Sequence, residues 1–186
     1  MAGMGTTEVR KTSAPLDPGM DLSAKQDHEE ELDPTIYLYA NILGKLMFLA
    51  GMTRPDLANS VRELGRRAAS PCMRHWRGLE HVLRYVAGTL DVCIHYNRGD
   101  KDMNKGDELL VGTDSQTRRS VTGYLLLFNK SPIAWRSKLQ GAVTLSSSEA
   151  EWTAMAYGMR HCIFLQGILG EIGILQDQTP WFCDNR

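Results

Sequence analysis

The sequence predicts a mixed α/β (α+β) fold, in which a small helical bundle precedes an incomplete mixed sheet with one long helix. Three observations predict it. Apolar residues recur at helical spacing through residues 35–89, short apolar runs typical of strands follow between residues 92 and 135, and helical spacing returns over residues 148–170. A helical bundle and a sheet covered by a helix each bury their apolar faces in a core of their own, so we expect two small cores.

The 186 residues can bury one good core or two small ones, and the 42% apolar content is ordinary for a globular protein. No apolar run approaches the roughly 20 residues needed to cross a bilayer. The N-terminus lacks the apolar region of a secretory signal. The cysteines are widely spaced without a C-x-x-C pair: Cys72, Cys93, Cys162 and Cys183. These features predict a reduced intracellular protein, cytoplasmic or nuclear and not secreted.

Residues 1–34 are polar and carry eight acidic and three basic side chains, a net charge of −5. They show no apolar period, which predicts a flexible lead-in unless a partner orders it. We therefore expect three parts: the lead-in 1–34, a helical segment 35–98 and a layered domain 107–186.

Three helices are predicted between residues 35 and 89. The first runs to Gly51 with an apolar stripe of Ile36, Ala40, Leu43, Met47 and Ala50. The second opens with a capping pair, Thr53 and Asp56, and has the stripe Leu57, Val61, Leu64 and Ala68. The third opens at Ser70-Pro71, ends at Gly88 and has the stripe Trp76, Leu79, Val82, Leu83 and Val86. None of these helices could bury its stripe alone, so a bundle is expected.

Strands are predicted from the short apolar runs 92–96, 109–114, 121–128 and 132–135, and from Trp181–Cys183 near the end of the chain. The third and fourth runs are joined through Asn129-Lys130, which favours an antiparallel meander. A helix over 148–170 separates these runs from the last strand, with Ala154, Met155, Cys162, Ile163, Leu165 and Leu169 directed inward.

Residues 53–98 carry eight arginines against four acidic residues, a net charge of +4. Guanidinium groups bind phosphate in a bidentate manner and stay charged, so Arg66, Arg67 and Arg77 are candidate nucleic-acid contacts. The alternative is a solvated helical face, which a charge pattern taken alone favours.

Three acids occupy positions that could converge. Asp114 and Asp184 each follow an apolar run, and Glu151 lies in the first turn of the long helix. Converging carboxylates repel one another unless they bind cations, and hard oxygen ligands suit Mg²⁺ or Mn²⁺. Each acid also has a structural alternative, because Ser148 and Glu151 form a capping-box pattern and an Asp after a strand often begins a turn.

Short motifs along residues 14–186 carry a resemblance to a known family. They are Ala14-Pro-Leu-Asp-Pro-Gly19, Gly44-Lys-Leu-Met-Phe-Leu-Ala50, Thr53-Arg-Pro-Asp56, His75-Trp76, Val82-Leu-Arg-Tyr85, Gly88-Thr89, Thr117-Arg-Arg-Ser-Val-Thr-Gly-Tyr124, Pro132-Ile-Ala-Trp135, Ser137-Lys138, Leu145-Ser-Ser-Ser-Glu-Ala-Glu151 and Cys183-Asp-Asn185. In this order and spacing, the set resembles the end of the reverse transcriptase and the RNase H domain of copia-type retrotransposon polyproteins.

The resemblance implies that residues 35–89 are thumb or connection helices that grip a duplex, and that residues from about 107 onward form an RNase H-like domain. It implies that Asp114, Glu151 and Asp184 are catalytic and hold two Mg²⁺ or Mn²⁺ ions, which would hydrolyse the RNA strand of an RNA–DNA hybrid. Arg118, Arg119 and Lys138 are then candidate phosphate contacts, with exposed strand-end charge as the alternative.

The match to the family is incomplete. The acidic and tryptophan-containing stretch that the resemblance places after Asp114 is absent, and the sequence stops before a fourth carboxylate. We therefore expect impaired catalysis and no polymerase activity. Two alternatives stay open: a non-catalytic retrotransposon remnant whose uncovered sheet and lead-in contact a protein partner, and a nucleic-acid binder that uses the arginine-rich helices.

Overall fold

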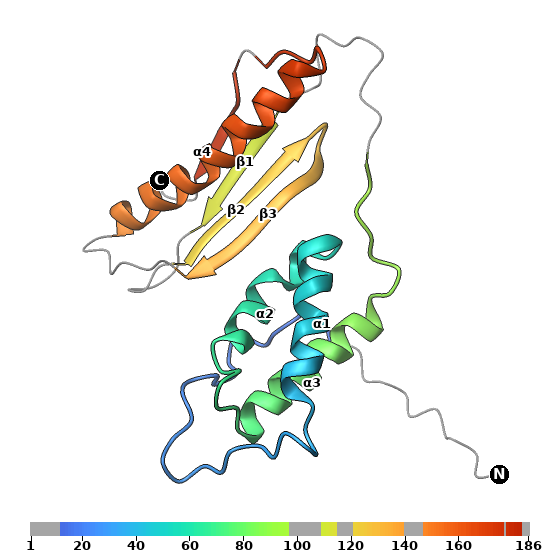
Figure 1. Cartoon of the computed structure of the whole chain (residues 1–186), viewed down its shortest axis with the longest axis vertical. Coiled ribbons are helices and arrows are strands. Elements are labelled where there is room, and N and C mark those ends of the chain that lie inside the picture. Colours follow the sequence, from blue (N-terminus) through green and yellow to red (C-terminus); the bar gives the residue numbers. More distant parts are fainter. Residues whose placement is uncertain (1–11, 97–108, 115–120, 140–146, 177, 184–186) are drawn as a thin grey trace, which may run out of the picture. The chain divides into compact units, whose positions relative to one another are not determined.

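The computed structural model describes residues 12–96, 109–114, 121–139, 147–176 and 178–183. The chain divides into two compact units, Met1–Cys93 and Ile94–Arg186. The first unit is helical, and the second contains a four-stranded sheet and one long helix (Figure 1). The predicted mixed α/β class is confirmed.

The helical unit contains α1 (Tyr39–Met52), a short 3-10 turn η1 (Pro55–Leu57), α2 (Ala58–Gly65) and α3 (Met73–Gly88). Their apolar faces meet in one core, which consists of Leu32, Tyr39, Leu43, Leu46, Ala50, Leu57, Val61, Leu64, Leu79 and Val82. Two further members of the predicted stripes lie outside it, because Ala68 is exposed beyond the end of α2 and Leu83 is 37% exposed on α3.

The buried stripe of α1 differs from the predicted one. It consists of Tyr39, Leu43, Leu46 and Ala50, whereas Ile36 and Met47 are 69% and 55% exposed. Both stripes have helical spacing, so periodicity alone could not choose between them. The Tyr39 hydroxyl donates a 2.9 Å hydrogen bond to the carbonyl oxygen of Leu64. This bond to the end of α2 holds the Tyr39 face of α1 toward the core.

The predicted capping pair of Thr53 and Asp56 is wrong. Thr53 follows the last turn of α1, and Asp56 pairs with Arg54, whose Nε and Nη2 lie 3.0 and 2.8 Å from its carboxylate oxygens. Arg54 also donates to the backbone and side-chain oxygens of Thr89, at 3.0 and 2.8 Å. Burial raises the pKa of Asp56, but hydrogen bonds from Arg54 and Tyr85 outweigh it and leave that pKa below its usual value. Arg54 therefore ties η1 to the end of α3.

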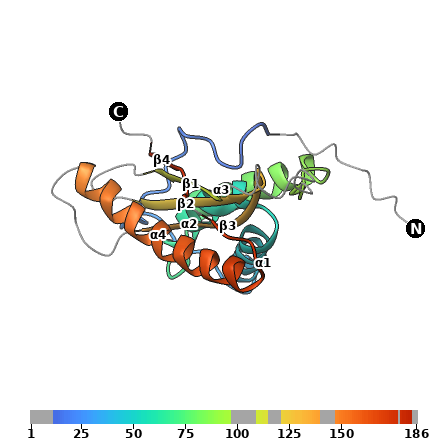
Figure 2. The same cartoon turned by 90° about the horizontal axis from the view of Figure 1, so that it is seen from above.

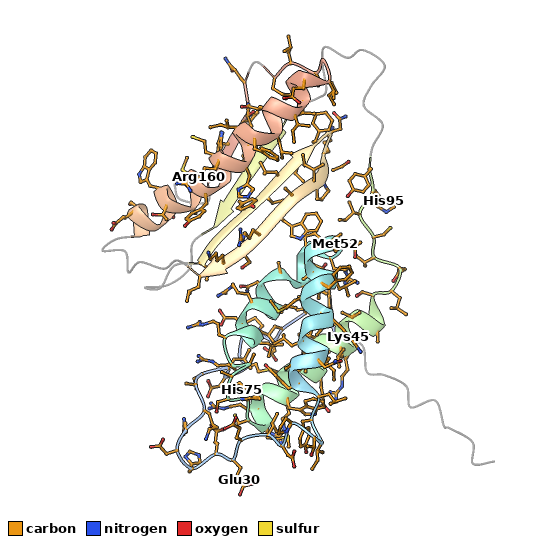
Figure 3. The ribbon with its side chains drawn as sticks, viewed as in Figure 1. Glu30, Lys45, Met52, His75, His95 and Arg160 are labelled. Atoms are coloured by element: carbon orange, nitrogen blue, oxygen red, sulfur yellow. The ribbon has the colours of Figure 1, made fainter. Side chains whose placement is uncertain are left out.

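The start of α3 also differs from the prediction, because Cys72 rather than Ser70 is the N-cap residue. The Cys72 amide donates to Nδ1 of His75 at 3.0 Å. Since Nδ1 accepts, Nε2 carries the proton and donates to the carbonyl oxygen of Ser23 at 2.9 Å. His75 is fully buried, and Figure 3 shows it between α3 and the segment that precedes α1.

Residues 12–34, called the acidic strap below, do not form a flexible lead-in. Leu32 is buried in the helical core, and Leu16 and Leu22 pack against it. The Leu32 amide donates to the carbonyl oxygen of Pro71, and Glu31 pairs with Cys72 in an isolated antiparallel bridge. Composition predicted disorder because the strap is highly charged, but its three spaced leucines and its polar contacts to α3 are enough to dock it.

The second unit contains β1 (Leu109–Asp114), β2 (Val121–Phe128), β3 (Ser131–Leu139), α4 (Ser147–Glu171) and β4 (Trp181–Cys183). These elements agree with the predicted runs. The strand predicted over residues 92–96 is wrong, because that segment has no strand pairing and exposes Val92 and Tyr96. No neighbouring strand pairs with this segment among the described residues, so its apolar residues do not form part of a sheet.

The sheet has the strand order β3-β2-β1-β4. β2 pairs antiparallel with both β1 and β3, which confirms the predicted meander, and β4 pairs parallel with β1. Asn129 and Lys130 have φ angles of 50° and 61°. Two consecutive residues with positive φ form the tight hairpin turn whose twist matches the flanking strands. The sheet is therefore mixed, as predicted.

Helix α4 lies along one face of the sheet (Figure 2). The core there is built from Tyr124 and Leu126 of β2 and Cys162 of α4, and the Tyr124 ring lies 4.8 Å from the His161 ring. Ile163, predicted to face inward, is 60% exposed. The apolar residues of α4 are distributed around nearly the whole helix, so periodicity could not identify the face that is buried.

Candidate functional site

The carboxyl ends of two strands meet at one edge of the sheet. Asp114 is the last residue of β1, and the residue before it, Thr113, is the register partner of Cys183, the last residue of β4. Because β1 and β4 are parallel, they point to the same edge. Asp184 follows Cys183 in the sequence and lies outside the described residues, as does the side chain of Asp114.

The amino end of α4 lies at the same edge. α4 runs in the direction opposite to β1, so its first turns are beside the carboxyl end of β1 (Figure 1). Glu151 is partly exposed, and Glu149, two residues earlier in the first turn, is exposed. α4 begins at Ser147, which places Ser148 inside the helix rather than at its N-cap. Negative side chains in this turn are also favoured by the helix dipole.

The positions of the strand and helix ends are compatible with a metal centre. Two parallel strand ends and one helix start lie at one edge, and carboxylate oxygens, which the three predicted acids supply, are the ligands that Mg²⁺ and Mn²⁺ prefer. Within the described ranges, no three His, Cys, Asp or Glu side chains gather closely enough to hold a metal ion. That set does not include the complete predicted triad, so the triad stays a prediction.

Lys138, predicted to contact phosphate, is exposed on the edge strand β3, where it pairs with Thr122 of β2. An exposed lysine on an edge strand also protects a sheet from pairing with another chain. Arg118 and Arg119 lie outside the described residues.

The three candidate arginines of the helical unit differ in their surroundings. Arg66 forms an ion pair with Glu63 at 3.2 Å, and Arg67 donates from Nε to the carbonyl oxygen of Leu22 at 2.9 Å. Arg77 is exposed on α3. Of these three side chains, Arg77 is therefore the most accessible to a phosphate group, and Arg67 is engaged by the acidic strap.

The sequence analysis did not single out Arg74, which has more charged partners than any of the three. It forms ion pairs with Asp21 and with Glu29 (2.6 Å), and its Nη atoms donate to Ser23 Oγ and Ala24 O at 3.0 Å. Opposite net charges on residues 1–34 and 53–98 were a signal that the two segments could pair. Pairing of individual residues could not be read from charge alone.

The carboxylates around Arg74 are stabilised in their charged form. Backbone and side-chain hydrogen bonds from Ser23, together with Arg74, hold the pKa of Asp21 below its usual value. The Gln26 amide and Arg74 do the same for the pKa of Glu29. Both groups are consequently ionised at neutral pH.

No helix in the described part of the chain is long and apolar enough to span a membrane. No protein-family model matches the chain, and no solved structure matches it.

Several curated proteins are similar to this chain. The retrovirus-related Pol polyprotein from transposon TNT 1-94 of Nicotiana tabacum is 32% identical over 181 residues, which cover 96% of this chain and 14% of the polyprotein. The retrovirus-related Pol polyprotein from transposon RE2 of Arabidopsis thaliana is 36% identical over 155 residues, 82% of this chain and 10% of the polyprotein. The secreted RxLR effector protein 161 of Plasmopara viticola is 37% identical over 129 residues, 68% of this chain and 90% of that protein.

The chain thus spans only a small part of the polyproteins that it matches. The match to the tobacco polyprotein nevertheless covers nearly all of this chain. A second Arabidopsis polyprotein, from transposon RE1, is 31% identical over 95% of this chain. The chain belongs to the family of copia-type retrotransposon Pol polyproteins and is a retroelement-derived protein.

Proposed function

We propose that this chain carries an RNase H-type activity, the metal-dependent hydrolysis of the RNA strand of an RNA–DNA hybrid. The observation that supports it is the parallel pairing of β1 with β4, which brings the strand end at Asp114 and the strand end before Asp184 to one sheet edge. α4, which carries Glu151, begins at the same edge. The proposal extends the family relationship to an activity.

In this proposal, Asp114, Glu151 and Asp184 hold two Mg²⁺ or Mn²⁺ ions through their carboxylate oxygens. When bound, such ions activate a water molecule and stabilise the oxygen that leaves in phosphodiester hydrolysis. The chain's own part is to fix three negative groups on rigid elements, so that the ions and the scissile phosphate meet in one place.

Basic side chains supply the proposed substrate contacts. Lys138, Arg118 and Arg119 contact phosphates, and Arg66, Arg67 and Arg77 are the candidates of the helical unit. These contacts position the duplex without reading its sequence. Preference for RNA rests on the 2′-hydroxyl groups displayed in a wide, shallow minor groove.

The test is cleavage by the purified 186-residue chain. A hybrid with a labelled RNA strand is incubated with Mg²⁺, with Mn²⁺ or with chelator, beside RNA–RNA and DNA–DNA duplexes of the same sequence. We expect cutting of the RNA strand in the hybrid alone, and only with metal. A folded chain that leaves the hybrid intact in both metals, or cuts all three duplexes equally, contradicts the proposal.

One observation favours a second candidate, a non-catalytic subunit that binds a protein partner. α4 and the residue that follows it expose large apolar side chains, and Trp152, Ile163, Phe164 and Ile172 are each at least 60% exposed. Contiguous exposed apolar surface is typical of interaction sites. This candidate predicts a folded chain without nuclease activity, so the cleavage test separates the two.

A further inference from the structure

The acidic strap and the helices beneath it carry opposite charge. Residues 12–34 contain seven acidic residues and one lysine, a net of −6, whereas residues 58–88 contain six arginines and two glutamates, a net of +4. The strap therefore presents carboxylates to the same helices that carry the candidate phosphate contacts. Both parts belong to the first unit, so their contacts are described within one compact body.

Arg74 is the centre of the contact between them. Its Nη atoms bind the carboxylates of Asp21 and Glu29 and two further oxygens of the strap, from Ser23 and Ala24. Each Nη atom donates to one carboxylate, so both terminal groups with which a guanidinium binds phosphate are occupied. Its Nε is buried without a hydrogen-bond partner among the described residues, so the strap leaves one donor unsatisfied.

Neighbouring contacts extend this interface along α2 and α3. Arg67 binds the carbonyl oxygen of Leu22, and His81 Nε2 lies 3.1 Å from the carbonyl oxygen of Ala14. Arg77 is exposed one turn beyond Arg74 on α3. Residues three apart lie on the same side of a helix, so Arg74 and Arg77 form adjacent positions on one surface.

A small residue allows the strap to approach α3. A Cβ atom added at Gly78 would lie 3.0 Å from Leu64 Cδ2, 3.1 Å from Leu22 Cδ2 and 3.4 Å from Met20 Sδ. Leu22 and Met20 of the strap thus pack against α3 at Gly78, where the helix has no side chain. Its charged contacts are more exposed, since 63% of the Asp21 side chain is accessible to solvent.

We infer that the acidic strap is an internal competitor of nucleic acid for the arginine surface formed by Arg67, Arg74 and Arg77. Carboxylates of the strap occupy Arg74 as phosphates of a duplex would, and the duplex reaches Arg74 only by displacing them. Ion pairs near the protein surface contribute little each, so the carboxylates of Asp21 and Glu29 can release Arg74 while Leu16, Leu22 and Leu32 keep the strap docked. The strap therefore lowers the affinity of the chain for nucleic acid.

This inference rests on the proposed nucleic-acid substrate but not on catalysis. Binding is measured in chelator by the fluorescence anisotropy of a labelled RNA–DNA hybrid, so that failure to cleave does not affect the result. The test variant is Asp21→Asn with Glu29→Gln, which removes both anions at Arg74 and keeps the side-chain shapes. We expect its affinity for the hybrid to rise about fivefold or more above that of the unchanged chain.

The matched control is Asp27→Asn with Glu30→Gln, which removes two charges from the same strap. Both side chains are exposed, neither has a contact with Arg74, and Figure 3 shows Glu30 at the outer edge of the strap, away from the helices. We expect this variant to bind distinctly more weakly than the Asp21/Glu29 variant. Equal tightening by both variants would mean that only net charge matters and would overturn the inference.

Hydrogen exchange gives a second, independent measurement on the unchanged chain. We expect the amides of Ser23 and Gln26, which donate to the Asp21 and Glu29 carboxylates, to exchange faster when the hybrid is bound, because those carboxylates are displaced from Arg74. Unchanged or slower exchange there overturns the inference, as does absence of hybrid binding by every variant. Cleavage without displacement of the strap would leave the proposed function standing and the strap inference refuted.

Discussion

Replacing Asp114 by Asn is expected to lower the rate of hybrid cleavage by at least about 100-fold, because two ions lose a charged ligand that they share in the proposed site. The change removes one charge and keeps the side-chain size. Asp114 ends β1 at the sheet edge, so Asn there leaves the pairing of β1 with β2 and β4 intact. Cleavage rates are measured at saturating metal with labelled hybrid.

The helix residue is tested with a matched pair. Glu151→Gln is expected to reduce the rate to a similar extent, whereas Glu149→Gln, which removes the same charge from an exposed position two residues earlier, is expected to change it by no more than about threefold. The reverse outcome, loss with Glu149→Gln and activity with Glu151→Gln, would assign the helix ligand to Glu149. Full activity of Asp114→Asn would contradict the proposed site.

Replacing Leu79 by Ala is expected to destabilise the helical unit by about 2–5 kcal/mol, because it removes buried methyl groups and leaves a cavity. Leu79 is fully buried on α3, in the cluster that also holds Leu57 and Leu64. Urea unfolding is followed by hydrogen exchange in peptides from residues 55–88, which reports this unit separately from the sheet.

Leu83→Ala is the control on the same helix. Leu83 is 37% exposed, so its truncation is expected to cost about 1 kcal/mol or less. Similar losses at Leu79 and Leu83 would contradict the placement of the core, and would instead support the wider apolar stripe that periodicity predicted.

Strands were predictable from the sequence where short apolar runs lay between turn residues. The meander from Val121 to Leu139 turns at Asn129-Lys130, and an asparagine readily takes the positive φ that this turn requires. The run at 92–96 has the same local pattern but no partner strand in the structure. Pairing is a long-range property, so local pattern could not separate these two cases.

Helix rotation and capping depended on contacts that are distant in sequence. The phase of α1 is tied to a hydrogen bond between Tyr39 and Leu64, and the turn before α2 is organised by Arg54, which reaches Thr89. The strap also depends on distant contacts. Its composition predicted a flexible segment, but it docks through Arg74 and against Gly78, which has no side chain. Such partners become visible only once the chain is folded.

For the candidate site, the sequence predicted which elements carry the acids, and the structure places the ends of those elements at one sheet edge. Asp114 and Cys183 end parallel neighbours, a pairing that the sequence analysis had left open. The distances among the three carboxylates depend on side-chain positions that neither sequence pattern nor strand register determines. The proposed metal site is therefore the claim that most needs a direct measurement.

That measurement is a titration with Mn²⁺, in which electron paramagnetic resonance reports the free ion. The chain is saturated with a hybrid whose RNA strand cannot be cut, so that phosphate oxygens complete the ligand set. We predict two bound Mn²⁺ ions per chain, beyond those bound by the hybrid alone, and loss of at least one of them in Asp114→Asn. No binding beyond that of the hybrid, or equal binding by the unchanged chain and the variant, would contradict a metal centre built on Asp114, Glu151 and Asp184.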